Sequence, residues 1–463
     1  MREYTTPYRE SVVKGIRDLT DSLRDSDRLL VARNLRPYES GLRLQQVPTP
    51  VVHGIYEVKW PFPQLLVSSV GHWICGHNQI SLFDPNLVIN SLVAVDEANP
   101  WSIADFGKFA VGMNGYQKIA KSTSSPYYVG LYTNNAVPTG GCCCDFNRGQ
   151  LIVGDLSNGW YDGDENYIAW SRIGEVSCIP DRRNTAGWMP MDWGGRVLVV
   201  KQLGQHIMVY GEGGISWIHP DSGTWGQRHL EITGVPFHTA VAGDKRRHYV
   251  VDNSGELWRI SSPTDIVRLG GKGVIQELMG QGVIVVTHHP RRDECYVSGE
   301  SFHYVRTRTG WGGPNYVPLS GTIYHKPQGQ TRGGLLVVPA RGGQVQLDVA
   351  EFLTDTIVMG SNAQKTLQWL EVQLDTDANQ YEARARYRYY SSDAWKDTGW
   401  KTSNSEGVTR LDIAGTEFQL GFRVLKDNLL SCLIDEIRVK WKATDNRFAR
   451  GTAVATAQQG GLA

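Results

Sequence analysis

The chain of 463 residues carries 47 Lys and Arg against 47 Asp and Glu, which gives a formal net charge of zero. This balance argues against a protein that grips nucleic acid through a concentrated basic face. The length predicts more than one domain, and 41% hydrophobic residues with 15 Trp and 20 Tyr are ample for a large, strand-rich core.

The cysteines and the first residues bear on the compartment. The seven cysteines are an odd number without a CxxC pair. This pattern does not suit a disulfide framework and favours assembly in a reducing cytoplasm. The opening MREYTTPYRE lacks the apolar stretch of a signal peptide. No run of about 18 apolar residues occurs, so no membrane-spanning helix is predicted.

Residues 1–50 are predicted to form an N-terminal arm. Apolar residues from Val12 to Leu23 recur at near-helical spacing, so we expect one short amphipathic helix over residues 10–28. Pro37 and Gly41 make the following stretch, ARNLRPYESGL, an extended segment rich in turns. The arm is expected to pack on the main domain or to reach a neighbouring subunit.

A β-hairpin recurs through residues 51–355. Its clearest copies are HIMVYGEGGISWI at His206–Ile218 and HYVVDNSGELWRI at His248–Ile260. The starts of the seven copies, separated by 36 to 56 residues, are Trp73, Phe109, Leu151, Ile207, Tyr249, Cys295 and Leu335. A period of roughly 40–45 residues built only of strands is typical of propeller blades. The predicted fold class is therefore all-β, with an irregular six- or seven-bladed β-propeller over residues 51–355.

A Trp-rich insertion, CIPDRRNTAGWMPMDW at Cys178–Trp193, accounts for the longest interval. Long loops on a rigid β scaffold commonly contact partners. The alternative is an ordered loop that packs on its own blade.

After the repeat, residues 356–443 are predicted to form an antiparallel, sandwich-like β domain, followed by a flexible tail over 444–463. Strict alternation in YEARARYRYY and EFQLGFRVL, with Phe418 to Val424 facing inward, marks strands with one solvated face. Arg384, Arg386 and Arg388 form a row on one such strand. Guanidinium groups in a row suit carboxylates or phosphates, so this row is the candidate interaction surface, expected to serve subunit or partner contacts.

Several segments contain residue types that occur in catalytic or metal sites. His288 and His289 are adjacent, and neighbouring residues of a strand point to opposite faces, so we expect a surface hairpin turn there and no shared ion. The same geometry applies to Cys142–Cys144, expected to be buried small hydrophobes. GGKG at 270–273 lacks the spacing of a phosphate cradle. We therefore predict no catalytic, cofactor-binding or metal-binding residue, no cofactor and no enzymatic activity.

Propellers also host glycosidases, which gives an alternative function. HPDSGTW at His219–Trp225 is similar to the Asp-turn of sialidase blades, but it lacks the initial Ser and one further residue, and it occurs once. A carbohydrate-binding or glycoside-processing propeller would need acids that converge on a central pocket. A protein-interaction scaffold is the other alternative, and it would have more regular blades.

Four segments in order along the chain resemble the propeller-bearing hub and nozzle proteins in the tails of short-tailed bacteriophages. They are NLRPYESGL at Asn34–Leu42, YIAWSRIGEVSCIP at Tyr167–Pro180, GGRVLVVKQLGQHIMVYGEGGISWI at Gly194–Ile218, and the closing WLEVQL, YRYYSSDAW and GFRVL. The resemblance spans about residues 34 to 442.

This resemblance implies a structural component of the virion tail, assembled in the host cytoplasm. It implies a homo-oligomeric ring, expected to be a hexamer, that holds packaged DNA and conducts it during ejection. It also implies docking to portal or adaptor proteins and to fibres, spikes or a needle. The genomic DNA would pass through the lumen with weak contacts, since a neutral chain neutralises few phosphates unless its basic residues are segregated.

Overall fold

The structure is a computed structural model of the whole chain. It describes residues 3–7, 29–38, 41–44, 64–75, 79–83, 89–94, 100–122, 130–131, 135–138, 141, 143–157, 160, 163–221, 224–289, 292–315, 319–323, 335–339, 349–359, 363–376, 381–425 and 432–444. The helix expected over residues 10–28 and the tail expected over 444–463 fall outside the described residues, apart from residue 444.

The chain divides into two compact units. The first, the sandwich unit, holds Met1–Gln46, Tyr304–Tyr316 and Gln344–Ala463. The second, the propeller unit, holds Val47–His303 and Val317–Gly343. Both ends of the chain therefore belong to the sandwich unit, and the propeller unit is inserted between them.

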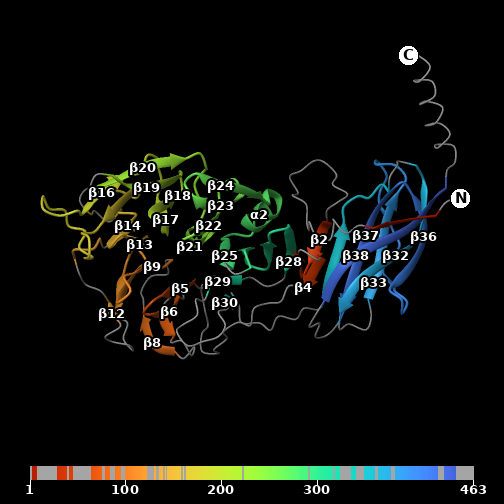
Figure 1. Ribbon diagram of the computed structural model, residues 1–463, viewed down its shortest axis with the longest axis horizontal. Coiled ribbons are helices and arrows are strands. Elements are labelled where there is room, and N and C mark those ends of the chain that lie inside the picture. The colour runs from red at the N-terminus through yellow and green to blue at the C-terminus, as the bar shows by residue number, and fades with distance from the viewer. Residues whose placement is uncertain are drawn as a thin grey trace, which may run out of the picture. The chain divides into compact units, whose positions relative to one another are not determined.

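Five four-stranded antiparallel sheets make blades 1 to 5 of the propeller unit (Figure 1). Blade 1 consists of β5 (Gln64–Ser68), β6 (Gly71–Cys75), β7 (Gln79–Phe83) and β8 (Ile89–Ala94). Blade 2 consists of β9 (Ser102–Asp105), β10 (Phe109–Met113), β11 (Lys118–Ser122) and β12 (Gly130–Leu131). Blade 3 consists of β13 (Cys143–Asn147), β14 (Gln150–Gly154), β15 (Tyr167–Trp170) and β16 (Gly187–Pro190).

The remaining blades follow the same order of strands. Blade 4 consists of β17 (Val197–Leu203), β18 (His206–Gly211), β19 (Ile215–Asp221) and β20 (Thr224–Leu230), and blade 5 of β21 (Val241–Asp244), β22 (Arg247–Val251), β23 (Leu257–Ser262) and β24 (Asp265–Gly270). Two hairpins complete this unit: blade 6 contains β25 (Val285–His289) with β26 (Glu294–Ser298), and blade 7 contains β29 (Leu319–Ile323) with β30 (Leu335–Pro339).

The first strands of the seven blades form a closed inner ring. Each of β5, β9, β13, β17, β21 and β25 contacts the next, β25 contacts β29, and β29 contacts β5. The ring has seven members, so the chain is a seven-bladed β-propeller, which confirms the predicted fold class. Each of the seven predicted repeat starts falls in the second strand of one blade, from Trp73 in β6 to Leu335 in β30.

Buried second strands explain why the repeat was visible in the sequence. In β14 and β26 every residue is buried, because a second strand is covered by the neighbouring blades on both faces. Such strands appear as short apolar runs between turns. Two buried indole N–H groups have serine hydroxyl partners: Trp73 donates to Ser68 Oγ over 2.8 Å, and Trp193 donates to Ser216 Oγ over 2.9 Å.

The sandwich unit has two antiparallel sheets. One has the order β3-β4-β38-β32-β36, with β1 also paired to β38. Its strands are β1 (Glu3–Pro7), β3 (Leu35–Tyr38), β4 (Gly41–Leu44), β32 (Lys365–Thr376), β36 (Val408–Gly415) and β38 (Cys432–Ala443). The second sheet contains β28 (Trp311–Asn315), β2 (Leu29–Arg33), β31 (Val349–Thr354), β37 (Glu417–Leu425), β33 (Tyr381–Arg388), β34 (Lys396–Asp397) and β35 (Lys401–Thr402).

The alternation predicted for the C-terminal strands is present. Phe418, Leu420, Phe422 and Val424 are fully buried, as expected for the inward face of β37. The boundaries differ from those expected, because β2 pairs with β31 and β4 pairs with β38. The N-terminal segment thus contributes strands to the sandwich, and residues 349–354 belong to the sandwich unit.

Helical structure is sparse among the described residues. A short 3-10 helix, η1, spans His238–Ala240. The α-helix α2 spans Lys272–Met279 and buries Val274, Ile275 and Leu278. The preceding Gly270 and Gly271 have positive φ angles of 71° and 90°, a backbone that favours glycine. No helix among the described residues has the length and apolarity needed to cross a membrane.

The strand β27 (His303–Arg306) begins with His303, which is the last residue of Val47–His303, the first of the two stretches of chain that make up the propeller unit.

Candidate functional site

The predicted interaction row lies on β33. Arg384, Arg386 and Arg388 share one face of this strand, as their alternation predicted, and each guanidinium has an acidic partner. Arg384 pairs with Glu351 at 3.3 Å, Arg386 with Asp397 at 3.2 Å, and Arg388 with Glu417 at 2.6 Å. The row is therefore held by carboxylates of its own unit.

Aromatic rings hold the same face further. The ring of Trp400 lies 4.3 Å from the guanidinium carbon of Arg384 and 4.4 Å from that of Arg423. Trp395 lies 4.4 Å from that of Arg388. An Arg side chain binds a ligand through its N–H donors and through the planar face of its guanidinium group. Pairing with carboxylates occupies the donors, and stacking on indole occupies the face. This arrangement favours a role in stabilising the sandwich.

The two adjacent histidines lie in a place that the sequence did not predict. The expected surface turn is wrong: His288 and His289 end β25, an inner strand, and both are buried. The imidazole of His288 packs on Tyr249 with ring centroids 4.6 Å apart, and burial lowers its pKa to about 4. Among the described residues there is no group of three or more His, Cys, Asp or Glu that could hold a metal ion.

The described cysteines are buried thiols. Cys144, Cys178 and Cys295 are free and buried, which for Cys144 confirms the expectation of a buried small hydrophobe. Burial raises the pKa of Cys178 to about 12, so this thiol is not activated as a nucleophile. Cys142 and the side chain of Cys143 lie outside the described residues.

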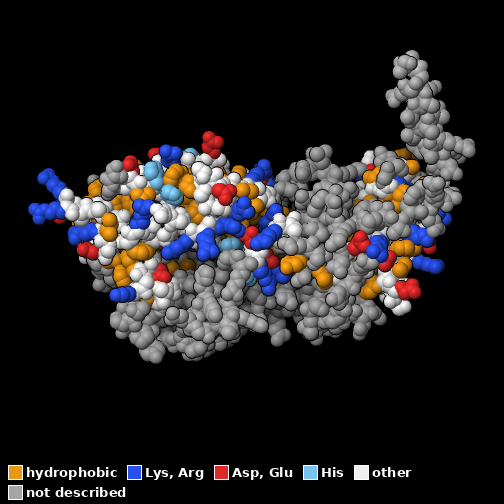
Figure 2. Space-filling view, viewed as in Figure 1, with side chains coloured by type: hydrophobic (Ala, Val, Ile, Leu, Met, Phe, Trp, Pro, Cys, Tyr) orange, Lys and Arg blue, Asp and Glu red, His pale blue; other side chains and the backbone are white. Residues whose placement is uncertain are grey.

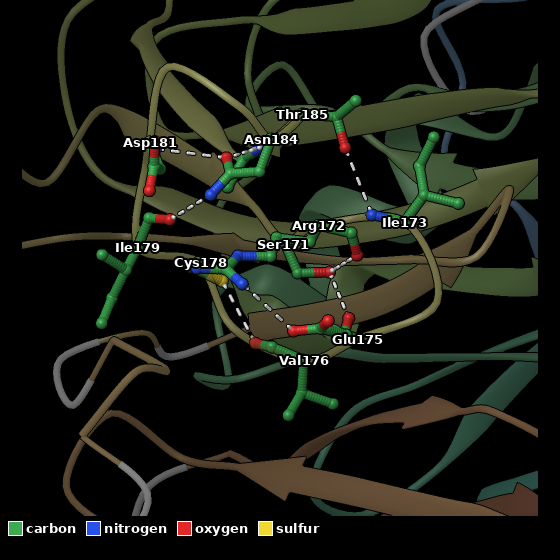
Figure 3. A network of polar contacts seen from close by, with 11 residues as sticks. Ser171, Arg172, Ile173, Glu175, Val176, Cys178, Ile179, Asp181, Asn184 and Thr185 are labelled. Carbon is green, nitrogen blue, oxygen red and sulfur yellow. Dashed lines mark hydrogen bonds and ion pairs between the residues drawn. The ribbon is translucent and has the colours of Figure 1, made fainter.

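The insertion between β15 and β16 is ordered by its own polar groups (Figure 3). Ser171 donates its hydroxyl to Glu175 O over 2.7 Å. Asn184 accepts the N–H groups of Asp181 and Ala186 on its Oδ1 and donates to Ile179 O. Cys178 N–H donates to Ala136 O over 2.7 Å, so the loop is also anchored to the connection between blades 2 and 3.

The turns that join the first and second strands of the blades, here called the first turns, are linked to one another. In blades 1 and 2, Ser69 Oγ donates to Gly107 O over 3.0 Å. Between blades 2 and 3, the rings of Phe106 and Phe146 lie 4.2 Å apart. In blades 3 and 4, Arg148 donates a guanidinium N–H to Gln205 Oε1 over 2.7 Å.

The linkage continues into blade 6. Gly204 N–H of blade 4 donates to Lys245 O of blade 5 over 2.7 Å. Arg247 of blade 5 pairs with Asp293 of blade 6, which also accepts the Tyr249 hydroxyl over 2.7 Å. The first turns of blades 1 to 6 thus form one continuous belt on one face of the propeller, called the turn belt below.

Cations project from this belt. Every exposed charged side chain on the described first turns is a Lys or Arg, and these five residues, the cationic rim, are Lys108, Arg148, Lys245, Arg246 and Arg292. The carboxylates on the same turns are less exposed: Asp105 and Asp293 accept hydrogen bonds within the belt. Figure 2 shows Lys and Arg side chains gathered over the part of the propeller that holds β21, β22 and β25.

The opposite face carries the other sign. Because strands alternate in direction, the second turns and the connections between blades lie opposite the first turns. The exposed acidic residues described there are Asp164, Asp192, Glu212, Glu231, Glu277 and Glu300, against one exposed cation, Arg196. Arg196 is paired with Asp155 at 3.2 Å.

The third turns lie on the same face as the first turns, and on or beside them the exposed acids Glu175, Asp181, Asp221 and Asp265 accompany the exposed cations Arg182 and Arg183. Among the described turns, exposed cations thus outnumber exposed acids by seven to four on the face of the cationic rim, against one to six on the opposite face, so the two faces differ in charge.

One carboxyl group, that of Asp145 on β13, lies close to the cationic rim. Desolvation raises the pKa of Asp145, while the nearby Lys201 and Lys245 act in the other direction. Its Oδ2 accepts the N–H of Gln202 from the next blade.

Sequence reasoning missed the cationic rim because its members are spread from residue 108 to residue 292 over four separate repeats. FGKF, FNRGQ, GDKRRHY and HPRRDE look like ordinary exposed turns when each is taken alone. The available signal was their equivalent place just before the second strand of successive repeats. Aligning the repeats on their second strands would have brought these cations together.

Comparisons with known proteins add the fold alone. No protein-family model matches the chain, and no curated protein matches it in sequence. The structure is similar to the WD40 domain of Pan2 from Neurospora crassa, with 8% identity and a TM-score of 0.37 over 59% of this chain and 86% of that one. It is similar to apo AztD from Citrobacter koseri, with 10% identity and a TM-score of 0.31 over 53% and 68%. The seven-bladed assignment itself depends on the strand pairing and closed inner ring of this chain.

Proposed function

We propose that this protein is a structural subunit of the tail of a short-tailed bacteriophage. In this role it forms a homo-oligomeric ring, a hexamer, that holds packaged DNA and conducts it during ejection. The ring docks to portal or adaptor proteins on one side and to fibres, spikes or a needle on the other. It acts mechanically and carries out no reaction.

One observation carries the proposal: a rigid propeller is inserted between the two ends of a separate sandwich unit. This organisation gives each subunit two bodies, one available for ring contacts and one for neighbours. The first of the segments that resemble the tail proteins, Asn34–Leu42, supports it. Asn34, with a φ of 56°, donates its side-chain N–H to Val349 O over 2.8 Å, and the following β3–β4 hairpin belongs to the sandwich.

The polar groups of the propeller suit a scaffold. Buried histidines, tyrosines and carboxyls are used in contacts between blades, as in Tyr210 OH with His248 Nδ1 at 2.7 Å. Buried hydrogen bonds of this kind between blades restrain the blades relative to one another. A conduit that must withstand packaged DNA needs such rigidity more than it needs a reactive site.

The mass and shape of the purified full-length protein test the proposal. Six copies of the 51.6-kDa chain give about 310 kDa. We expect mass photometry to show this species and negative-stain images to show rings with a central hole. A particle of 51.6 kDa at every concentration and salt tested, with no ring on addition of a portal complex, would contradict the proposal. Binding of such a monomer to a glycan panel would then favour the carbohydrate alternative.

A further inference from the structure

We propose that the cationic rim is a binding site for the phosphate backbone of nucleic acid, read without regard to sequence. The rim sits on the turn belt, so its cations are carried by linked backbone and not by free loops. Preorganisation matters here because a site that is already rigid loses less entropy when a ligand binds. The sequence argues against nucleic-acid binding because the net charge of the whole chain is zero. A zero net charge does not exclude a local basic surface, and the exposed cations are concentrated on one face of the propeller.

The placement of the cations favours a polymer over a small anion. Lys108 lies on blade 2, Arg148 on blade 3, Lys245 and Arg246 on blade 5, and Arg292 on blade 6. Donors on separate blades do not converge on one point, as a single phosphate would require. They form successive contact points along an arc, which suits a polyanion with regularly repeated charges.

The chemistry of the turns favours nucleic acid over an acidic protein. Protein interfaces depend on a buried core of aromatic and apolar anchors. None of the exposed large apolar side chains of the described residues lies on a first turn, and the same face carries two of them, Ile173 and Ile179, on the third turn of blade 3. The neighbouring groups are amides, such as Gln205, whose Oε1 accepts from Arg148. Guanidinium, ammonium and amide groups are those that contact phosphate oxygens.

Three rim residues allow a clean test because their side chains take no part in the turn belt. Lys245 joins the belt through its backbone carbonyl only. Within the described part of the chain, no carboxylate forms an ion pair with Lys245, Arg246 or Arg292. The triple variant Lys245→Gln, Arg246→Gln, Arg292→Gln should therefore keep its fold, which its melting temperature will show. The matched control removes three exposed cations of the sandwich: Lys396→Gln, Lys401→Gln and Arg410→Gln.

The measurement is fluorescence anisotropy of a labelled 20-base-pair duplex between about 50 and 200 mM salt. If each of the three residues neutralises one phosphate, the slope of log affinity against log salt should become shallower by about 2.7 in the triple variant. Its affinity near 0.1 M salt should fall at least about tenfold, while the control keeps the wild-type slope. If the triple variant unfolds, the single variant Arg292→Gln should make the slope shallower by about 0.9, which is one third of the change expected for the triple variant.

Three outcomes would overturn the inference. They are equal slopes in the rim variant and wild type, equal losses in rim variant and control, and binding of labelled poly-glutamate as tight as that of the duplex at the same salt. The last would indicate an acidic protein partner. The choice of nucleic acid as the polyanion rests partly on the proposed function, but the assay needs no ring. Rings without duplex binding refute only this inference, and duplex binding by a monomer refutes only the ring.

Discussion

Gly204 of blade 4 donates its backbone N–H to the carbonyl oxygen of Lys245 in blade 5 over 2.7 Å. The two residues are far apart in sequence, yet the bond joins equivalent turns of adjacent blades. Similar contacts repeat from blade 1 to blade 6, so neighbouring blades are fixed to each other at one face as well as through their apolar cores. Blade-to-blade polar contacts should therefore contribute measurably to propeller stability.

Asp293→Ala should destabilise the propeller by about 2 kcal/mol. The carboxylate of Asp293 pairs with Arg247 and accepts the Tyr249 hydroxyl, so its removal leaves two donors of blade 5 without this partner. Urea unfolding followed by circular dichroism measures the change. Asp265→Ala, which removes an exposed carboxylate from a third turn, is the control and should stay within about 0.5 kcal/mol of wild type. Equal effects of the two changes would show that the belt is energetically unimportant.

Gly211→Ala should destabilise blade 4 by about 1–3 kcal/mol. A Cβ atom at Gly211 would lie 2.1 Å from Cη2 of Trp193 and 2.8 Å from Arg196 O, so the buried indole would have to move. Gly194→Ala is the matched control, because a Cβ atom there meets nothing within 4 Å. Thermal unfolding of both variants checks the prediction. A melting temperature for Gly211→Ala equal to that of the control would mean that Trp193 repacks freely.

The sequence revealed the elements that repeat locally and missed those made by distant pairing. Second strands such as β22 are short apolar runs that recur along the chain. The recurrence located all seven of them in the sequence. The pairing of β2 with β31 joins residues more than 300 positions apart. No periodicity carries information on that pairing, so the insertion of the propeller into the sandwich was not foreseen.

The same distinction holds for the candidate site. The alternation of Arg384, Arg386 and Arg388 was legible because it lies within one strand. Their partners Glu351, Asp397 and Glu417 come from three other segments, and only the fold shows that the row is internally paired. The sequence placed His288 in a turn because HHPRRDE is polar, whereas the inner strand extends through both histidines and buries them.

Trp400→Leu should destabilise the sandwich by about 1–2 kcal/mol. Its indole lies against both Arg384 and Arg423, and each cation–π contact contributes about 0.5–1 kcal/mol. Tyr390→Leu, at a side chain that is 72% exposed, is the control and should change stability by less than about 0.5 kcal/mol. Urea unfolding of the full chain gives both values. If Trp400→Leu leaves stability unchanged but abolishes assembly, the Arg row serves subunit contacts, as the sequence predicted.

His288→Phe should make propeller stability less sensitive to acid. Burial holds the pKa of His288 at about 4, below its usual value of 6.5. Between these pH values the unfolded chain binds more protons than the folded one, so the free energy of unfolding falls as pH falls from 6.5 toward 4. Above pH 6.5 this contribution is fully present. The slope attributable to one histidine reaches at most about 1.4 kcal/mol per pH unit.

The phenylalanine variant keeps an aromatic ring on Tyr249, and His288 Nε2 has no hydrogen-bond partner to lose. Its stability at pH 7.5 should therefore stay close to that of wild type, while its loss of stability from pH 6.5 to 4.5 should be smaller. Urea unfolding at pH 7.5, 6.5, 5.5 and 4.5 tests this, with His229→Phe as the control for removal of an exposed imidazole. The half-buried His238 and the buried His248 keep titrating in the variant, since desolvation lowers their pKa values to about 4 and about 3. Superimposable curves for His288→Phe and wild type would show that His288 is protonated equally in the folded and unfolded chains, and its buried position in β25 would then have to be abandoned.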